Sequence, residues 1–322
     1  MKTVNQPVPS APSPNASPDG LEAVVMGRAG VDLYPMQLET PLEDVEGFHK
    51  YVGGFAANVA TGLARLGVRV AIVSAVGDDG HGRFVRRFLE AEGVDCRWLS
   101  VHPSLRTALA FCEAWPPDRF PITFYRTPTC PDWELTPGAL DLPAIAAVPL
   151  AYVSGTGLAR EPSRLATMAV AEARSDGGGT TVLDLDWRAM LWDDPVDYAV
   201  AVGACARMAD LVLGSDEEIA AAVGANAPER VLALGPAAVV QKHGPDGATV
   251  HARDGGRDRI PPYPVEVVNG LGAGDAFAAA LGWRLLRGDT TAAAAAVANR
   301  AGAHVAARLG CSLAMPYEGD LA

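Results

Sequence analysis

The residues most able to do chemistry lie in a glycine-rich segment near the end of the chain. Gly270, Gly272 and Gly274 alternate with apolar residues, and Asp275 follows them directly at the start of an apolar helical pattern. The first backbone N–H groups of a helix have no partner within it, and together with the helix dipole they favour a bound anion. A carboxylate at this position would repel a phosphate if the segment served only to bind phosphate. The pattern therefore indicates a base that takes a proton from a hydroxyl while the N–H groups hold a phosphoryl group in transfer.

Two other interpretations of this segment stay open from the local sequence. Asp is a favoured residue at helix starts, so Asp275 can be a cap without a catalytic role. The glycines can also form a dinucleotide-binding loop, although the full G-x-G-x-x-G spacing is absent and the segment lies late in the chain. A Walker A loop is excluded because Gly-Lys-Ser/Thr is missing.

The residues around the glycines predict a strand, a turn and a helix. The β-branched run from Val265 to Val268 predicts the strand, and apolar residues at helical spacing from Phe277 to Leu285 predict the helix. Gly288 is a favourable helix end.

Strands and helices alternate through most of the chain, which predicts a layered α/β fold with a mainly parallel central sheet. Ligands of such sheets gather at the carboxyl ends of the strands. Several glycine-rich or polar segments lie at predicted ends of this kind: 27–32, 53–58, 184–188, 215–218 and 270–275. Helix capping alone does not explain this convergence, so we expect one composite site.

Composition limits the classes of function. The chain has 322 residues, of which 49% are hydrophobic, enough for one large domain over residues 21–322. Residues 1–20, rich in Pro, Ser, Ala and Asn, predict a disordered tail without the apolar core of a signal peptide. A net charge of −12 argues against a general nucleic-acid or anionic-membrane surface. No apolar run approaches the ~18 residues of a membrane span. Five scattered cysteines favour reduced thiols in a cytoplasmic protein over a disulfide framework.

The stretch from Gly272 to Phe277, Gly-Ala-Gly-Asp-Ala-Phe, resembles the signature of the ribokinase-like carbohydrate kinases, the pfkB family. The resemblance extends from about Val24 to Pro316. It implies a three-layer fold in which segments of about 33–52 and 97–127 form a small β-sheet lid, with a homodimer through this lid as a further expectation. It also implies that ATP, with Mg²⁺, phosphorylates a small sugar or sugar acid.

The resemblance implies roles for the matching residues. Asp275 is the base, and the backbone of Gly272, Ala273 and Gly274 stabilises the developing charge. The residues implied to bind substrate are Asp32, Gly53, Gly54 and Asn58. The residues implied to lie at the nucleotide are Lys242, Gly244, Gly247 and Asn299. Glu218 is implied to lie in the outer shell of Mg²⁺.

Two arginines favour a sugar acid over a neutral sugar. Arginine binds carboxylates in a bidentate way. A single arginine is more often a solvated surface residue. In related sugar-acid kinases, however, the positions that match Arg126 and Arg188 both hold the substrate carboxylate.

Some positions depart from the family pattern. Phe55-Ala56 replaces the Ser-Pro that is usual in close relatives, Ser215 replaces an Asn, and Asn269 and Leu271 replace the Asp and Thr found near a monovalent cation. A potassium site is therefore not part of the prediction. Other sugar or sugar-acid kinases remain alternatives, and a sugar-binding regulator without transfer activity is the alternative of a different class. The intact Asp275 and glycine loop weigh against the regulator.

Overall fold

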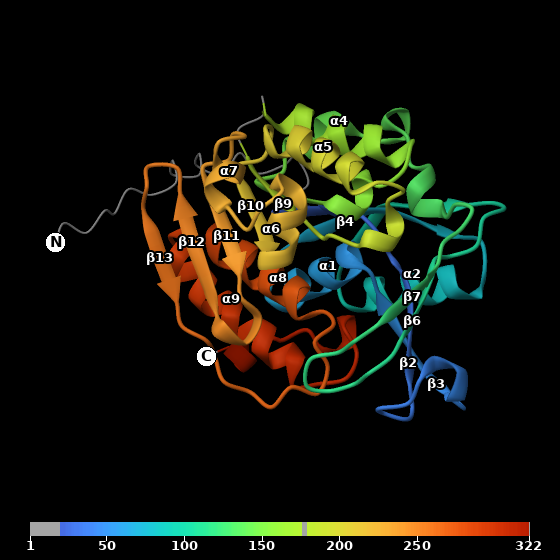
Figure 1. The fold of residues 1–322 in the computed structure, drawn as a ribbon. Coiled ribbons are helices and arrows are strands. Elements are labelled where there is room, and N and C mark those ends of the chain that lie inside the picture. The colour runs from blue at the N-terminus through green and yellow to red at the C-terminus, as the bar shows by residue number, and fades with distance from the viewer. Residues whose placement is uncertain (1–19, 176–178, 322) are drawn as a thin grey trace.

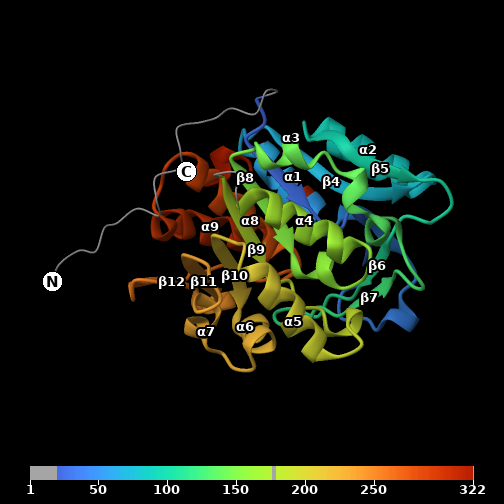
Figure 2. The same ribbon diagram turned by 90° about the horizontal axis from the view of Figure 1, so that it is seen from above.

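The computed structural model describes residues 20–175 and 179–321, so the predicted tail lies outside the described residues apart from Gly20. The described chain forms a large sheet between two layers of helices, with a small second sheet at one end (Figures 1 and 2).

The large sheet has the order β13-β12-β11-β10-β9-β8-β1-β4-β5. Its neighbours from β5 to β11 are all parallel, whereas β12 and β13 extend it as antiparallel strands. This confirms the predicted mainly parallel sheet. The strands are β1 (Ala23–Met26), β4 (Val70–Gly77), β5 (Asp95–His102), β8 (Leu150–Ser154), β9 (Thr180–Asp184), β10 (Leu211–Ser215), β11 (Ala238–Lys242), β12 (Ala248–Ala252) and β13 (Arg257–Ile260).

Helices cover both faces of this sheet, because successive side chains of a strand point to opposite faces. Val25 packs in a core with α1, α2, α8 and α9, while its neighbour Val24 packs in a second core with α3 to α7. The helices are α1 (Phe55–Arg65), α2 (Gly80–Ala91), α3 (Leu142–Ala146), α4 (Ser163–Ser175), α5 (Pro195–Ala206), α6 (Asp216–Val223), α7 (Pro228–Leu232), α8 (Ala273–Leu286) and α9 (Thr291–Ala306).

The small sheet has the order β3-β2-β6-β7, with β2 (Gly30–Pro35), β3 (Phe48–Gly53), β6 (Leu109–Cys112) and β7 (Ile122–Tyr125). Its strands come from both segments expected to form a lid, but two details of the prediction are wrong. Asp95–His102 pairs with β4 in the large sheet. Asp32 lies inside β2 of the small sheet, because the chain crosses between the sheets at 27–29 before it reaches this residue.

The predicted strand from Val265 to Val268 is also wrong, since 261–272 forms neither strand nor helix. Pro261, Pro262 and Pro264 directly precede this run, and proline removes the N–H that a sheet ladder requires. The predicted helix after the glycines is confirmed as α8, and Gly288 follows its end with a left-handed φ of 88°.

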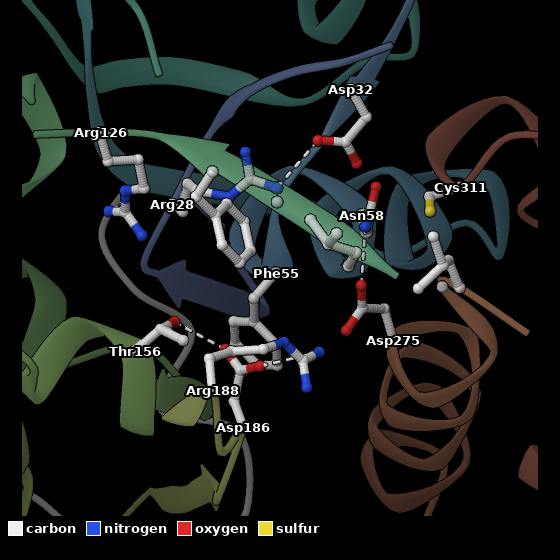
Figure 3. A pocket seen from close by; sticks show the side chains of 15 residues that line it. Arg28, Asp32, Phe55, Asn58, Arg126, Thr156, Asp186, Arg188, Asp275 and Cys311 are labelled. Carbon is white, nitrogen blue, oxygen red and sulfur yellow. Dashed lines mark hydrogen bonds and ion pairs between the residues drawn. The ribbon is translucent and has the colours of Figure 1, made fainter. Parts of the chain in front are cut away.

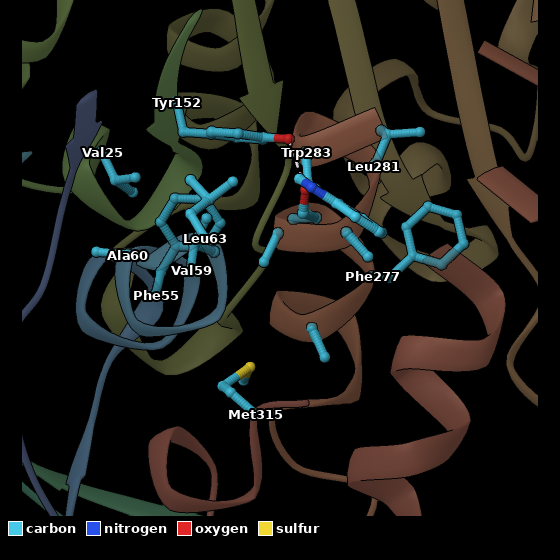
Figure 4. Packing of buried hydrophobic residues seen from close by; sticks show 14 of the residues in the cluster. Val25, Phe55, Val59, Ala60, Leu63, Tyr152, Phe277, Leu281, Trp283 and Met315 are labelled. Atoms are coloured by element: carbon cyan, nitrogen blue, oxygen red, sulfur yellow. Dashed lines mark hydrogen bonds between the residues drawn. The ribbon is translucent and has the colours of Figure 1, made fainter. Parts of the chain in front are cut away.

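Apolar side chains of α1 and α8, among them Val59, Leu63 and Leu281, lie in one buried cluster (Figure 4). A Cβ atom added at Gly62 of α1 would lie 2.6 Å from the Cβ of Ala279 in α8. On the sheet side of α8, the hydroxyl of Tyr152 donates a hydrogen bond of 2.6 Å to the carbonyl of Ala278. These contacts fix the position of α8 relative to both α1 and β8.

The fold shows two further features that bear on the compositional predictions. All five cysteines lie in the described part of the chain, where they are buried and unpaired. No helix in residues 20–175 and 179–321 combines the length and apolar character needed to cross a bilayer.

We predict that Gly62→Ala lowers the free energy of unfolding by about 1–3 kcal/mol, because the added methyl group forces α1 and α8 apart. Gly203→Ala in α5 is the matched control. An added Cβ there meets nothing within 4 Å, so the higher helix propensity of alanine should raise stability by up to about 1 kcal/mol. Urea denaturation measures both. Equal stability of the two variants would contradict the close packing.

Candidate active site

A pocket lies where the small sheet faces the starts of α1 and α8 (Figure 3). It encloses about 510 Å³, including the part open to solvent. Seven of the predicted site residues line it: Asp32, Gly54, Asn58, Arg126, Arg188, Gly272 and Asp275. The structure thus brings together residues that the sequence separates by more than two hundred positions.

Asp275 is the third residue of α8, and no side chain caps this helix start. The alternative that Asp275 is only a helix cap is therefore wrong. Its Oδ2 instead accepts a hydrogen bond of 2.7 Å from the Nδ2 of Asn58 in α1. Asn58, expected to bind substrate, thus contacts the predicted base directly.

The environment of Asp275 suits a base that works near neutral pH. Burial raises the pKa of its carboxyl to about 7, and the nearby Asp186 and Asp184 raise it as well. The hydrogen bond from Asn58 and the positive charge of Arg188 act in the opposite direction.

Asp32 is held by a buried cation that sequence reasoning missed. The Nη2 of Arg28 donates a hydrogen bond of 2.9 Å to its Oδ1, and both side chains line the pocket. Gly53 provides the room for this carboxylate, since a Cβ at Gly53 would lie 1.8 Å from Asp32 Oδ2. Gly53 therefore allows the close approach of Asp32, whereas Gly54 lines the pocket itself.

The opposite wall is formed by a polar group after β9. Asp186 accepts a hydrogen bond of 2.6 Å from the Thr156 hydroxyl and lies 3.3 Å from the Nη2 of Arg188. Its φ of 36° is unusual for a residue with a side chain, and such strain is characteristic of functional sites. Arg188 is thereby fixed at the edge of the pocket nearest Asp275 in Figure 3.

Arg126 is almost completely buried, with 2% of its surface exposed. Its guanidinium pairs with Asp132, donates from Nε to the sulfur of Cys130 and stacks 4.0 Å from the centre of the Trp133 ring. Its Nη1 has no hydrogen-bond partner among the described residues. A buried charged donor without a partner is costly unless a ligand supplies an acceptor.

Positive charge also lies behind the start of α8. The Nζ of Lys242 is 3.3 Å from Asp184 and 3.9 Å from Glu218, and it would lie 3.5 Å from a Cβ added at Gly274. An ammonium beside free helix N–H groups is a suitable environment for a phosphate. Burial raises the pKa of Asp184 to about 6, although Lys242 opposes this rise.

Glu218 also has a local structural role. Its side chain accepts a hydrogen bond of 2.7 Å from the backbone N–H of Ser215, and the Ser215 hydroxyl accepts one from the N–H of Glu218, which is a capping box at the start of α6. Mg²⁺ usually binds one or two carboxylates together with substrate phosphates. Asp184 and Glu218, adjacent to the helix start, fit this donor set. The described residues contain no cluster of three or more acidic, His or Cys side chains arranged for a metal.

The other predicted nucleotide residues lie outside the pocket. Gly244 and Gly247 flank the turn between β11 and β12 with φ of 57° and 89°. A Cβ at Gly247 would approach the Ile260 carbonyl to 2.3 Å, so this glycine allows close packing of the chain on itself. The Asn299 side chain donates a hydrogen bond of 2.7 Å to the Pro261 carbonyl. Contacts of these residues with a nucleotide stay predictions.

The remaining lining residues were given no role from the sequence, with three exceptions. Phe55 and Asp186 were expected to shape the pocket, and Leu271 was noted only in connection with a cation. The remaining lining residues are Arg28, Phe55, Ile122, Phe124, Thr156, Asp186, Leu271 and Cys311. Arg28 had a usable signal, because a charged residue directly after a buried first strand often faces a ligand. The apolar residues Ile122 and Phe124 had none, since their position depends on how the small sheet folds over the pocket.

A buried carboxylate beside a helix start, in a pocket of acids and arginines, is an arrangement suited to group transfer to a hydroxyl. Residues 21–317 match the model of the "pfkB family carbohydrate kinase". The chain therefore belongs to the pfkB family of carbohydrate kinases, as its resemblance predicted.

Individual proteins agree with this assignment. The chain is 33% identical over 306 residues to a 5-dehydro-2-deoxygluconokinase of Clostridium tetani, covering 92% of this chain and 90% of that protein. It is 35% identical over 278 residues to one of Photobacterium profundum, covering 83% of each. The crystal structure of aminoimidazole riboside kinase from Salmonella enterica, complexed with aminoimidazole riboside and an ATP analog, superimposes with a TM-score of 0.79 at 28% identity, covering 93% of this chain and 98% of that one.

We predict that the Asp275 carboxyl titrates near pH 7, far above an ordinary aspartate, because burial disfavours its charged form. Carbon-13 NMR of protein labelled at aspartate carboxyl carbons measures this, with Asp275→Asn identifying the resonance. A midpoint below pH 5 would contradict the described environment.

Proposed function

We propose that this protein transfers the γ-phosphoryl group of ATP to the terminal hydroxyl of 5-dehydro-2-deoxy-D-gluconate, giving 6-phospho-5-dehydro-2-deoxy-D-gluconate and ADP. The observation that carries the proposal is the placement of Asp275 at the start of α8 within a pocket that three arginines line. The names of the relatives from C. tetani and P. profundum support the substrate.

Asp275 is the base in this mechanism. One oxygen of its carboxylate is held by Asn58, and the other accepts the proton of the substrate hydroxyl as that oxygen attacks phosphorus. The bond from phosphorus to the ADP oxygen breaks in line with the attack. The backbone N–H groups of Gly272, Ala273 and Gly274 stabilise the charge on the phosphoryl oxygens.

The groups behind the helix start hold the phosphates. Lys242 offers its ammonium to them, and Gly244, Gly247 and Asn299 are proposed to border the nucleotide. Asp184 and Glu218 would hold Mg²⁺ through its water shell. Bound there, the cation would supply positive charge that neutralises the phosphates.

The arginines favour an acidic substrate. Within the described residues the buried Nη1 of Arg126 has no partner, and Arg188 lines the same pocket. A carboxylate that reached both would receive charge-assisted hydrogen bonds. Asp32 and Gly54 are proposed to contact the substrate hydroxyls. Related acids such as 2-dehydro-3-deoxygluconate, and neutral sugars such as fructose or ribose, are the alternatives, and Phe55 is the lining residue most able to change the choice. The homodimer through the small sheet and the cytoplasmic location stay predictions.

Asp275→Asn is expected to reduce turnover by about 10²–10⁴-fold, since the amide cannot accept the hydroxyl proton. Binding of ATP and the unfolding midpoint should stay close to wild type, because Asn58 can still hydrogen-bond the amide oxygen. Coupled ADP release, calorimetric ATP binding and thermal unfolding measure the three quantities. An Asn variant with near-wild-type turnover would remove Asp275 from the mechanism.

Arg188→Gln is expected to raise KM for the sugar acid by about tenfold to a hundredfold, the loss associated with a hydrogen bond to a charged group. KM for a neutral acceptor such as fructose should change little. Arg83→Gln is the matched control, because the Arg83 side chain is 71% exposed on α2. The same change in KM for acidic and neutral acceptors would argue against a carboxylate at Arg188.

A further inference from the structure

A chain of hydrogen bonds runs from the end of the protein to Asp275. Ser312 lies in a short turn after α9, within the stretch Gly310 to Pro316, to which no role was assigned. Its hydroxyl donates a hydrogen bond of 2.6 Å to the Oδ1 of Asn58, whose Nδ2 donates one of 2.7 Å to the Oδ2 of Asp275. Ser312 is fully buried and Asn58 is 2% exposed, so the bond between these two side chains is shielded from water.

The chemistry of these groups sets the direction of the chain. An ionised carboxylate only accepts hydrogen bonds, so Asn58 must turn its NH₂ group towards Asp275. Its carbonyl oxygen then points away and is buried, and it needs a donor. The Ser312 hydroxyl is that donor.

The same arrangement separates the two oxygens of Asp275. Oδ2 is occupied by Asn58, whereas no protein donor to Oδ1 is found within residues 20–175 and 179–321. Figure 3 shows this second oxygen turned from Asn58 towards the pocket and Arg188. The fixed amide thus presents one carboxylate oxygen to the substrate.

We propose that Ser312 is a positioning residue for phosphoryl transfer: by donating to Asn58 it holds that amide against one oxygen of Asp275 and keeps the other oxygen directed at the acceptor hydroxyl. This inference rests on the proposed function, since it concerns the base of that reaction. Ser312 does not touch the substrate and acts only through Asn58.

The role has a consequence for pH dependence. Donation by Asn58 lowers the pKa of Asp275, so a displaced amide lets that pKa rise from its value of about 7. Less of the base is then ionised at pH 7, and the lost activity returns as the pH rises. Other charged or titratable groups interact electrostatically with Asp275. They are Asp184 at the end of β9, Asp186 and Arg188 after it, Lys242 at the end of β11, and Cys311. All of these are unchanged when only the Ser312 hydroxyl is removed.

The test compares Ser312→Ala, Asn58→Ala and the double variant, with kcat and KM measured from pH 5.5 to 9.5. Ser312→Ala should lower kcat at pH 7 by about tenfold and change KM for the acceptor by less than about twofold, as expected for the loss of one hydrogen bond to a charged network. The acid limb should move up by about half a pH unit or more, so that the loss shrinks towards pH 9. In the Asn58→Ala background, removal of the Ser312 hydroxyl should have almost no further effect.

Ser74→Ala is the matched control, because Ser74 is a fully buried serine in β4 whose hydroxyl has no partner in the described structure. Its kcat and pH profile should equal those of wild type. If Ser312→Ala does not fold, Ser312→Cys keeps the side-chain volume with a much weaker donor and takes its place in every measurement.

Carbon-13 NMR titration of Asp275 in the unliganded protein separates this inference from the proposed function. A higher pKa of Asp275 in Ser312→Ala than in wild type supports the positioning role. This holds even if wild type phosphorylates none of the acceptors, because missing activity would refute only the proposed function. An unchanged midpoint, an unchanged pH profile, or fully additive effects in the double variant would overturn the role of Ser312.

Discussion

The close packing of α1 against α8 is the constraint on which the site depends. Gly62 leaves no room for a methyl group beside Ala279, so the two helices are fixed relative to each other. Their first turns consequently bring Asn58 and Asp275 to a hydrogen bond of 2.7 Å. That distance could not be kept if either helix shifted by the size of one side chain. The distance between these two polar side chains is thus set by the packing of the apolar core.

The pocket also concentrates charge in a way that only the fold produces. Arg28 and Asp32 pair at one wall, Arg188 and Asp186 at another, and Lys242 with Asp184 and Glu218 behind the start of α8. Among these acidic residues, Asp275 has no ion pair with a cation of the described chain. Burial raises the pKa of its carboxyl to about 7. An acid left without an ion-pair partner among paired neighbours is well suited to exchange a proton near neutral pH.

Much of this arrangement could be predicted from the sequence, because alternating strands and helices determine a parallel sheet and its carboxyl ends collect ligand residues. The family signature placed Asp275, and the helix pattern after it was correct. The strand before the glycines was predicted wrongly because β-branched residues outweighed three prolines. Asp32 was assigned to the end of a main strand because nothing local shows that the chain changes sheets after Gly27. Thr156 and Ser312 were missed for a similar reason: their partners Asp186 and Asn58, 30 and 254 positions away, are met only after folding. Arg28 lies only four positions before Asp32 and was overlooked although its place after a buried strand was a usable signal.

A competition between acceptors tests the proposed substrate most directly. The enzyme would receive limiting ATP and Mg²⁺ with equal concentrations of 5-dehydro-2-deoxygluconate, 2-dehydro-3-deoxygluconate, fructose and ribose, and phosphorus-31 NMR with mass spectrometry would identify the esters formed. If the proposed function is right, the phosphate ester at the terminal CH₂ group of 5-dehydro-2-deoxygluconate predominates. A product mixture dominated by fructose or ribose phosphate would contradict it, because the arginines of the pocket would then not select a carboxylate.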